Sequence, residues 1–513
     1  MRCPKMSATI ITFAVGGLVL AGSAGVAHAQ CQANELAKLT ASDAAAYDAY
    51  GHCVSISGDV AVVGAWEDIH AGVSSGSAYV YRLNGADWVE EVKLVATDAA
   101  TNDEFGVSVA VSGDVAVIGA HLDDDGGPDS GSAYVYSFDG TEWIEQAKLT
   151  ASDATPYDNF GWSVSISGDA VVVGANLNDD AGPNSGSAYV FKRPPGGWVD
   201  MTETAKLTAG DATENDEFGR CVAISGDVVA IGAHYDSDDA FQSGSAYVFV
   251  KPPSGWESMT AETAKLTASD PSDLDRLGLA VAIDGDVVVA GAWADDDGGS
   301  ASGSAYVYNQ PLDGWADMTE TAKLAASDAA AGDHFGWSVS INGDVAMIGA
   351  PAHLWDGSGF GSAYAYRFDG TDWIEEAKLT ASDGAEDDEF GYSVSISGDA
   401  AVIGSRYHTT GGYDNAGATY LYRGLSDCND NRVLDICDIT DGTSPDDNGN
   451  GIPDECECPG DLDGDGDTDQ ADLGILLSDW GCTGGNCPGD LNADGNTDQA
   501  DLGILLADWG CAP

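Results

Sequence analysis

The sequence predicts an all-β fold over residues 31–425, a seven-bladed β-propeller of four-stranded blades, followed by a small loop-and-helix tail. Three observations predict this fold. A phrase close to K-L-T-A recurs seven times at intervals of 55 to 59 residues, which is the kind of period that propellers show. Each repeat contains four segments with strand character. The last repeat lacks its fourth segment, and the chain supplies one near its start.

The four segments of a repeat differ in pattern, as the second copy shows. S-V-A-V alternates small polar and apolar residues, and V-A-V-I-G-A is a continuous apolar run typical of a strand buried on both faces. G-S-A-Y-V-Y is aromatic and β-branched. W-I-E-Q-A-K-L-T alternates apolar and charged residues, and charge on an outer strand hinders edge-to-edge pairing. S-G-D between the first two segments predicts a tight turn.

The ends of the repeat array predict a closed ring. The last repeat stops at Leu421-Tyr422-Arg423, while residues 35–40 look like the end of a fourth strand with nothing before it. We therefore expect the N-terminal strand to complete the last blade. We also expect a tryptophan to open the fourth strand of six repeats: Trp88, Trp143, Trp198, Trp256, Trp315 and Trp373.

Acidic residues gather in two loops that fall on the same face of such a ring. The loop between the second and third strands carries clusters such as 123–125 and 295–297. Two interpretations remain open, a cation-attracting face for divalent ions or a basic partner, and turns stabilised by aspartate. The loop before the first strand carries aspartate pairs: Asp43/Asp48, Asp98/Asp103, Asp153/Asp158, Asp211/Asp216, Asp270/Asp275, Asp328/Asp333 and Asp383/Asp388.

The words F-G-x-S-V, V-A-V-x-G-A and G-S-A-Y-V-Y resemble the FG-GAP repeat of integrin α-subunit propellers and of many secreted bacterial proteins. The resemblance covers residues 36–425. It implies the propeller fold and says little about function. The calcium loop of that family, where present, lies between the first two strands and is rich in aspartate. Here this place holds Ser57-Gly58-Asp59 and its equivalents, so we do not expect that calcium site.

The N-terminus and the net charge indicate export. Arg2 and Lys5 precede an apolar run that starts at Ile10, and residues 27–29 form an A-x-A cleavage pattern. We predict a signal peptide over residues 1–29 and a secreted protein, extracellular or at the cell surface. No later stretch is apolar enough to insert into a membrane. A formal charge of −66 repels nucleic acid and favours cations.

Two loops in the tail have the spacing of calcium ligands. Calcium takes about six to eight oxygens, and a loop supplies them from positions 1, 3, 5, 7, 9 and 12, with glycine at position 6. Each loop runs into the same helix-like stretch, A-D-L-G-I-L-L-x-D-W-G, whose apolar face could pack against its twin. The first loop holds Asp461, Asp463, Asp465, Asp467, Asp469 and Asp472. The second holds Asp490, Asn492, Asp494, Asn496, Asp498 and Asp501.

The paired loops resemble the duplicated repeat of type I dockerins over residues 458–511, with aspartate at position 12 in both. The resemblance implies Ca²⁺ as the cofactor and a cohesin as a candidate partner. Two weaker loops fill residues 427–457, and D-x-N-x-N-G-I-x-D in the second resembles the thrombospondin type 3 repeat. Their candidate ligands are Asp427, Asn429, Asn431, Asp435 and Asp438, then Asp446, Asn448, Asn450, Ile452, Asp454 and Glu457. We expect the tail to be ordered only with calcium.

Seven of the eleven cysteines lie between residues 428 and 511, and export makes disulfides possible. Equal spacing predicts the pairs Cys458–Cys482 and Cys487–Cys511, which would staple the tail. Cys53 and Cys221 stand where most copies have serine, three blades apart, and we expect buried free thiols. The pairing of the others remains open: Cys31, Cys428, Cys437 and Cys456.

The sequence contains no catalytic arrangement that we would assign. Residues 72–76 match G-x-S-x-G, but that nucleophile needs a strand-to-helix turn and this is a loop between predicted strands. We therefore expect a secreted, calcium-binding, non-catalytic binding or adhesion protein, with a protein or glycan partner at the ring face or at the dockerin-like tail. The alternative is an accessory component of extracellular polysaccharide degradation, attached through that tail.

Overall fold

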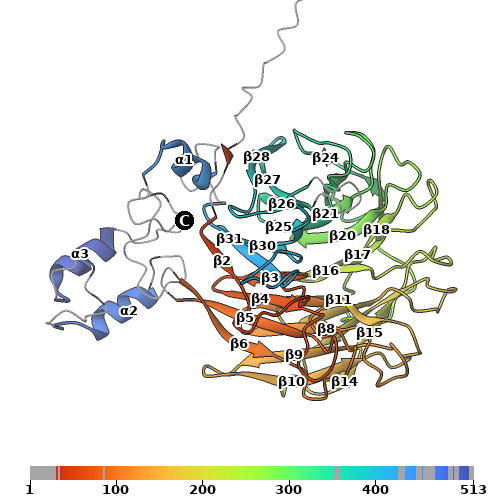
Figure 1. The fold of residues 1–513 in the computed structure, drawn as a ribbon, viewed down its shortest axis with the longest axis horizontal. Coiled ribbons are helices and arrows are strands. Elements are labelled where there is room, and N and C mark those ends of the chain that lie inside the picture. The colour runs from red at the N-terminus through yellow and green to blue at the C-terminus, as the bar shows by residue number, and fades with distance from the viewer. Residues whose placement is uncertain are drawn as a thin grey trace, which may run out of the picture.

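The computed structural model describes residues 31–32, 35–84, 87–351, 359–425, 434–445, 453, 468, 470–482, 489, 491 and 496–507. The predicted signal peptide lies outside them. The chain forms seven antiparallel sheets arranged as the blades of a ring, and short helices lie beside the ring (Figure 1). The all-β, seven-bladed prediction is confirmed.

The first four blades follow the chain. Blade 1 contains β3 (Val54–Ser57), β4 (Val60–Ala65), β5 (Ser77–Asn84) and β6 (Asp87–Leu94). Blade 2 contains β7 (Ser108–Ser112), β8 (Val115–Ala120), β9 (Ser132–Phe138) and β10 (Trp143–Thr150). Blade 3 contains β11 (Phe160–Ser167), β12 (Ala170–Ala175), β13 (Ser187–Lys192) and β15 (Ala205–Leu207). Blade 4 contains β16 (Cys221–Ser225), β17 (Val228–Ala233), β18 (Ser245–Val250) and β19 (Ala264–Thr267).

The last three blades close the ring. Blade 5 contains β20 (Leu277–Asp284), β21 (Val287–Ala292), β22 (Ser304–Asn309) and β24 (Ala322–Leu324). Blade 6 contains β25 (Ser338–Asn342), β26 (Val345–Ala350), β27 (Ser362–Phe368) and β28 (Trp373–Leu379). Blade 7 contains β29 (Phe390–Ser397), β30 (Ala400–Ser405), β31 (Ala418–Tyr422) and, from the N-terminus, β2 (Ala37–Leu39).

The N-terminal strand completes the last blade, as predicted. Strand β2 pairs antiparallel with β31, with Ala37 opposite Leu421 and Leu39 opposite Thr419. Before it, β1 (Cys31–Gln32) pairs parallel with β28 of blade 6. The N-terminal segment therefore pairs with blades 6 and 7, and its strand β2 gives blade 7 its fourth strand.

The hydrophobic core lies between neighbouring blades. In one such layer Val62 of blade 1 packs with Ile118 and Tyr134 of blade 2, all at most 1% exposed. Phe105 stands edge-to-face on Tyr134 with ring centroids 5.5 Å apart, a geometry that adds to area burial. Such a layer recurs around the ring, so each blade packs against both of its neighbours.

Polar side chains fasten consecutive innermost strands to one another. Ser55 Oγ accepts a hydrogen bond from the backbone N–H of Val111 at 3.0 Å, and Ser57 Oγ accepts one from Gly113 at 3.1 Å. Cys53 stands at the preceding site of this kind, where its Sγ accepts from Val109 N–H at 3.3 Å. Cys53 and Cys221 are both free, as predicted, although each is only partly buried.

In every blade, a glutamate on or just before the outer strand bonds to the segment that follows the outer strand of the preceding blade. Glu145 of β10 accepts hydrogen bonds from the backbone N–H and the hydroxyl of Thr97 at 2.9 and 2.8 Å. Six glutamates make the equivalent contact in the other blades: Glu35, Glu90, Glu203, Glu262, Glu320 and Glu375. These contacts explain the glutamate in the fourth segment of the repeat.

The prediction that a tryptophan opens the fourth strand of six repeats is wrong in blades 3, 4 and 5. There Trp198, Trp256 and Trp315 lie buried before the strands, because three or four more residues separate this tryptophan from the lysine of the outer strand than in blades 1, 2 and 6. The two-residue strands β14 (Met201–Thr202) and β23 (Met318–Thr319) follow instead. They pair parallel with the outer strands of the preceding blades, β10 and β19.

The tail begins on the ring. Helix α1 (Asp435–Asp441) follows Leu434, which packs in one core cluster with Tyr422 and Leu425 of the ring. The helix itself was not expected. Helices α2 (Gln470–Ser478) and α3 (Gln499–Ala507) contact each other, with the equivalent residues Leu476 and Leu505 fully buried. The expected pairing of the twin repeats is confirmed. None of the described helices is long and apolar enough to cross a membrane.

Candidate functional site

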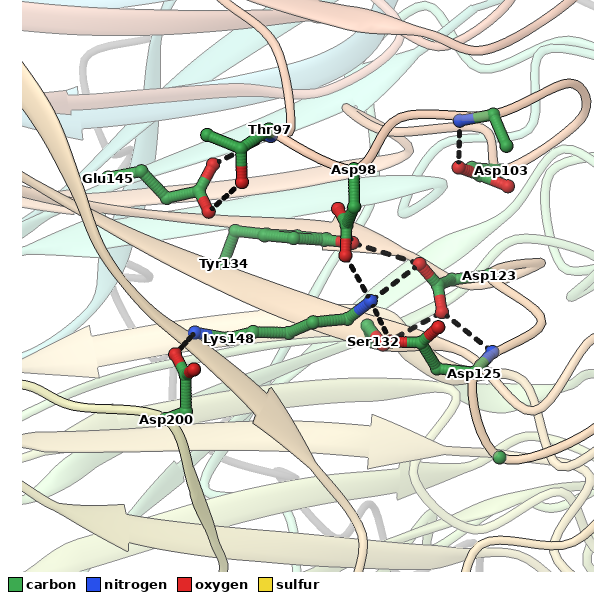
Figure 2. Close-up of polar contacts among 12 residues, drawn as sticks. Thr97, Asp98, Asp103, Asp123, Asp125, Ser132, Tyr134, Glu145, Lys148 and Asp200 are labelled. Atoms are coloured by element: carbon green, nitrogen blue, oxygen red, sulfur yellow. Dashed lines mark hydrogen bonds and ion pairs between the residues drawn. The ribbon is translucent and has the colours of Figure 1, made fainter.

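The acidic loops form a lysine-centred cluster in each blade, and blade 2 shows its geometry (Figure 2). The Nζ of Lys148 donates to Asp98 at 2.8 Å and to Asp123 at 3.0 Å, and it also contacts Asp125. The Tyr134 hydroxyl bonds to Asp98 and Asp123, both at 2.9 Å. The two acidic loops therefore share one face, as predicted.

The cluster recurs in all seven blades. In each, a lysine Nζ contacts the first aspartate of the pair at 2.6 to 2.8 Å, and a tyrosine hydroxyl bonds to the same aspartate. The lysines are those of the K-L-T-A phrase: Lys38, Lys93, Lys148, Lys206, Lys265, Lys323 and Lys378.

The amine occupies the place that a metal ion would need. Carboxylate oxygens of Asp98, Asp123 and Asp125 lie within 4.8 Å of one another, a spacing that would suit a divalent ion, but Lys148 Nζ bonds to all three. Burial lowers the pKa of Lys148, while its hydrogen bonds to these aspartates outweigh burial and raise the pKa overall. The lysine is thus a tethered cation, charged at any physiological pH.

The second aspartate of each pair stabilises a turn. Asp103 accepts a hydrogen bond from the backbone N–H of Ala100 at 2.5 Å, and burial raises its pKa to about 6. The same contact occurs in the other blades at Asp48, Asp158, Asp216, Asp275, Asp333 and Asp388. The turn-stabilising interpretation is confirmed for this position.

Nearer the axis, the same face carries a group of side chains that differ from blade to blade, which we call the inner cluster. It lies where the first strands begin and the second strands end: at the residue after F-G, at the first two residues after the second strand, and at Arg276 just before β20. The inner cluster comprises His52, Trp66, His121, Trp162, Arg220, His234, Tyr235, Arg276, Trp293, Trp337, Tyr392, Arg406 and Tyr407.

The rings of the inner cluster touch in sequence around the axis. His52 lies between Trp66 and Tyr392, at 5.2 and 5.1 Å between centroids. Tyr392 contacts Trp337 at 5.5 Å, and Trp337 contacts Trp293 at 5.3 Å.

Arginines continue this series. Arg276 stacks on Tyr235 at 4.6 Å and lies 5.6 Å from the centroid of Trp293. Arg220 stacks on Trp162 at 4.2 Å, which in turn contacts His121 at 4.7 Å. All seven blades therefore contribute to the inner cluster, although at the position after F-G blades 2 and 5 carry the aliphatic residues Val107 and Leu279.

The inner cluster contains charge that is not fully compensated. Arg406 bonds to Glu389 at 2.6 Å, whereas Arg220 has no ion pair within the described parts of the chain. Burial holds the pKa of His121 to about 3 and raises that of Glu104 to about 8, so both are neutral near pH 7. The Nδ1 atoms of His121 and His234 are buried, and none of the described residues forms a hydrogen bond with them. The cluster offers ring faces, a guanidinium and neutral polar groups to a ligand.

Our sequence interpretation missed the inner cluster, although aligning the seven copies of the repeat would have revealed two positions that contribute to it. The residue after F-G is His52, Val107, Trp162, Arg220, Leu279, Trp337 or Tyr392. The residue after the second strand is Trp66, His121, Asn176, His234, Trp293, Pro351 or Arg406. At these two positions an otherwise regular repeat carries a different side chain in nearly every blade.

In the tail, the described part of the second dockerin-like loop is folded back on itself. Asp501, at position 12, is fully buried and accepts hydrogen bonds from the backbone N–H of Leu491 at 3.0 Å and of Asp498 at 2.7 Å. These bonds bring position 12 to the start of the loop, which is how such a loop surrounds an ion. Asp498 is exposed and Asn496 partly buried.

The other predicted ligands are described only in part. Asp435 and Asp438 lie on α1, 1% and 3% exposed, and Asp472 lies on α2. Cys437 and Cys482 are disulfide-bonded, while the predicted pairs Cys458–Cys482 and Cys487–Cys511 remain predictions. The remaining candidates lie outside the described residues: Asp427, Asn429, Asn431, Asp446, Asn448, Asn450, Ile452, Asp454, Glu457, Asp461, Asp463, Asp465, Asp467, Asp469, Asp490, Asn492 and Asp494.

Comparison with known proteins agrees with the repeat. A family profile described as FG-GAP repeat matches residues 33–81, 88–136, 143–191, 201–249, 260–308, 318–366 and 373–422. A chain from a structure described as the crystal structure of the mitotic checkpoint complex matches with 11% identity and a TM-score of 0.46, covering 81% of this chain and 99% of that one. A search of curated proteins found no match.

Proposed function

Because the chain belongs to the FG-GAP repeat family, we propose that it is a secreted, non-catalytic binding protein whose ring presents one face to a protein or glycan partner. The inner cluster carries this proposal. The scaffold positions are nearly the same in every blade, yet the side chains around the axis differ. A ring that only had to fold would not need aromatic, arginine and histidine residues there, whereas a ligand across the axis would contact several blades at once.

The chemistry of the inner cluster favours binding over catalysis. Its arginines stack on aromatic rings, an arrangement that orients a guanidinium without activating it. A catalytic pair would need a nucleophile or a base within reach of a reacting atom. We therefore expect no turnover when the mature protein is incubated with a panel of glycans.

A pull-down tests this function. The mature protein, immobilised with calcium, is incubated with envelope and polysaccharide fractions of its own culture, and retained material is identified. We expect retention to fall at least tenfold in Trp162→Ala with Arg220→Gln, and to persist in Leu312→Asn, which removes a fully exposed side chain from the opposite face. Equal retention by all three proteins would contradict the proposal, provided that their Tm values show that they are folded.

We also propose that the tail binds Ca²⁺. The residues that would hold the ion in the last loop are those at positions 1, 3, 5, 9 and 12: Asp490, Asn492, Asp494, Asp498 and Asp501. The position of Asp501 supports this, because its hydrogen bond from Leu491 holds position 12 of the loop beside position 2. Calcium would supply folding energy to a tail with little core of its own.

The alternative function is an accessory role in extracellular polysaccharide degradation, with the tail as attachment module. The contact between α2 and α3 favours it, because twin helices with a common core present two equivalent outer faces to a partner. A pull-down of the mature protein with cohesin modules, with calcium and with EGTA, separates the two functions. Calcium-dependent cohesin binding would support the alternative.

A further inference from the structure

The outer rim of the same face carries exposed apolar side chains on left-handed backbone. Tyr47, Tyr157 and Leu274 precede the second aspartate of the pair in blades 1, 3 and 5. Their φ angles are 71°, 73° and 75°, and they are 59%, 61% and 43% exposed. Bulky residues rarely adopt this conformation, and here no burial compensates for it.

The other four copies show that the fold does not require these residues. The same position holds Asn102 and Asn215 at φ 66°, Asp387 at 67° and Gly332 at 86°, residues that tolerate the left-handed region. An exposed, strained tyrosine or leucine where asparagine would suffice indicates a function outside the fold.

Each of the three side chains has an exposed apolar neighbour on the preceding blade. The backbone N–H of Leu274 donates to the carbonyl of Phe241 at 2.8 Å, and Phe241 is 60% exposed. Tyr157 N–H donates to the exposed Pro128 at 2.8 Å. Tyr47 N–H donates to Asp414 at 3.0 Å, next to Tyr413, which is 51% exposed. We call these three pairs the rim platforms.

We propose that the rim platforms bind a neutral polysaccharide, with sugar rings stacked on the exposed aromatic and apolar side chains. The aspartates around them would accept hydrogen bonds from sugar hydroxyls and would repel polyanions. Each platform is one or two side chains wide, and the loops between platforms are acidic but also carry exposed Ile69, Val73 and Phe360. A protein interface needs a continuous patch of about 800 Å² per partner, whereas a sugar needs one ring face.

The three platforms sit on different blade boundaries, 7/1, 2/3 and 4/5, so one polymer could engage several. Weak single contacts then add through a high effective concentration. This inference rests on the proposed function, because it assumes that the same face of the ring binds the partner. It adds that the partner is a neutral polysaccharide. It does not require the inner cluster.

The test replaces each residue with the asparagine that other copies use. The triple variant Tyr47→Asn, Tyr157→Asn, Leu274→Asn, as full mature protein with calcium, is compared with the wild type on microcrystalline cellulose, mannan, polygalacturonate and poly-L-lysine. We expect wild-type retention on a neutral glycan, a loss of at least tenfold in the triple variant, and a Tm that rises by about 1 °C or more because strain is relieved. Leu312→Asn is the matched control for removing an exposed apolar side chain.

The outcomes separate the possibilities. Unchanged retention of the triple variant, or no wild-type retention on either neutral glycan, would overturn the inference. Retention on poly-L-lysine alone would show instead that the rim meets a basic protein. If the triple variant still retains the culture partner that Trp162→Ala with Arg220→Gln loses, the proposed function holds and this inference fails.

Discussion

At the residue scale, one lysine per blade decides what the acidic face can do. Lys148 lies among three carboxylates whose oxygens are close enough for a metal ion. The lysine comes from the outer strand and one of its aspartates from a loop fifty residues earlier, so the pair also ties the blade together. The acidic loops of the ring thus stabilise the fold, and we propose calcium binding only for the tail.

Replacing this lysine should both destabilise the ring and create a metal site. In Lys148→Met the aspartates repel one another, and we expect a loss of about 1–2 kcal/mol, because two of them are half exposed and screened. Calcium should restore part of the loss. Lys192→Met is the control, because its ion pair with Asp169 is exposed on both sides. Thermal unfolding with and without calcium measures both effects, and equal Tm values for Lys148→Met and wild type would refute the role.

The turn-stabilising aspartates predict that mild acid stabilises the ring. Burial raises the pKa of Asp48, Asp103 and Asp275 to about 6, above the usual value near 3.8. The folded state therefore binds more protons between about pH 4 and 6, and stability falls as pH rises through that window. We expect Tm to increase on going from pH 7 to 5.

The matching variant replaces the three carboxylates with amides. Asp48→Asn, Asp103→Asn and Asp275→Asn together should flatten the dependence of Tm on pH between 7 and 5, because these groups no longer titrate. If the variant keeps the full slope, other carboxylates cause it.

At the scale of elements, closure depends on a strand from the opposite end of the chain. Strand β2 is the outer strand of blade 7, so the last blade is incomplete until the N-terminal segment returns. Leu39 of β2 is 5% exposed in the layer between blades 7 and 1. In other blades the equivalent strand follows its neighbour directly.

Removing the closing strand should weaken the whole ring. We expect deletion of residues 31–40 to lower the free energy of unfolding by more than Leu266→Ala, the equivalent leucine of blade 4, for which about 2–5 kcal/mol is typical. A synthetic peptide of residues 31–40 added in trans should restore part of the loss. Denaturant unfolding measures the change in the free energy of unfolding. If the deletion leaves this free energy unchanged, β2 does not stabilise the closed ring.

The strands and the closure could be predicted because both depend on local pattern. Alternation and apolar runs identified the strands, and the missing fourth segment of the last repeat identified β2. The inner cluster could not be predicted in the same way, since Trp66, Tyr392 and Trp337 meet only after seven blades close around an axis. In blades 3 to 5 a longer interval between the tryptophan and the lysine of the repeat leaves Trp198 outside a strand, a difference in spacing that our prediction did not use. Calcium binding by the tail loops stays a prediction, and only the hydrogen bonds of Asp501 to Leu491 and Asp498 are described.

At the scale of the whole molecule, the two faces of the ring differ in the side chains that they carry. One face carries the inner cluster, the seven lysine-centred clusters and the rim platforms, while the other carries short turns such as 57–59 and 139–142. The tail adds a second unit, fastened to the ring through residue 434 and α1.

Calcium removal should affect the tail and spare the ring. With EGTA, or in Asp501→Ala, we expect faster hydrogen exchange in α2 and α3 and earlier proteolysis after residue 445, because the loops lose the ion that would neutralise their carboxylates. Exchange in the second strands of the blades should not change, since their cores contain no part of these loops. Asp239→Asn, in an exposed ring loop, is the control. Unchanged exchange in α2 and α3 after EGTA would contradict the calcium proposal.

The most direct test blocks one face at a time. In a Cys53→Ser, Cys221→Ser background, a single cysteine replaces either Ile69, on the face that carries the inner cluster, or Leu312, on the opposite face. Both side chains are highly exposed. The new cysteine is coupled to a 5-kDa polyethylene glycol maleimide. Retention of the partner fraction is then measured. We predict that the Ile69 adduct abolishes retention and the Leu312 adduct leaves it unchanged. Equal retention by both adducts, or loss only with the Leu312 adduct, would contradict the central claim.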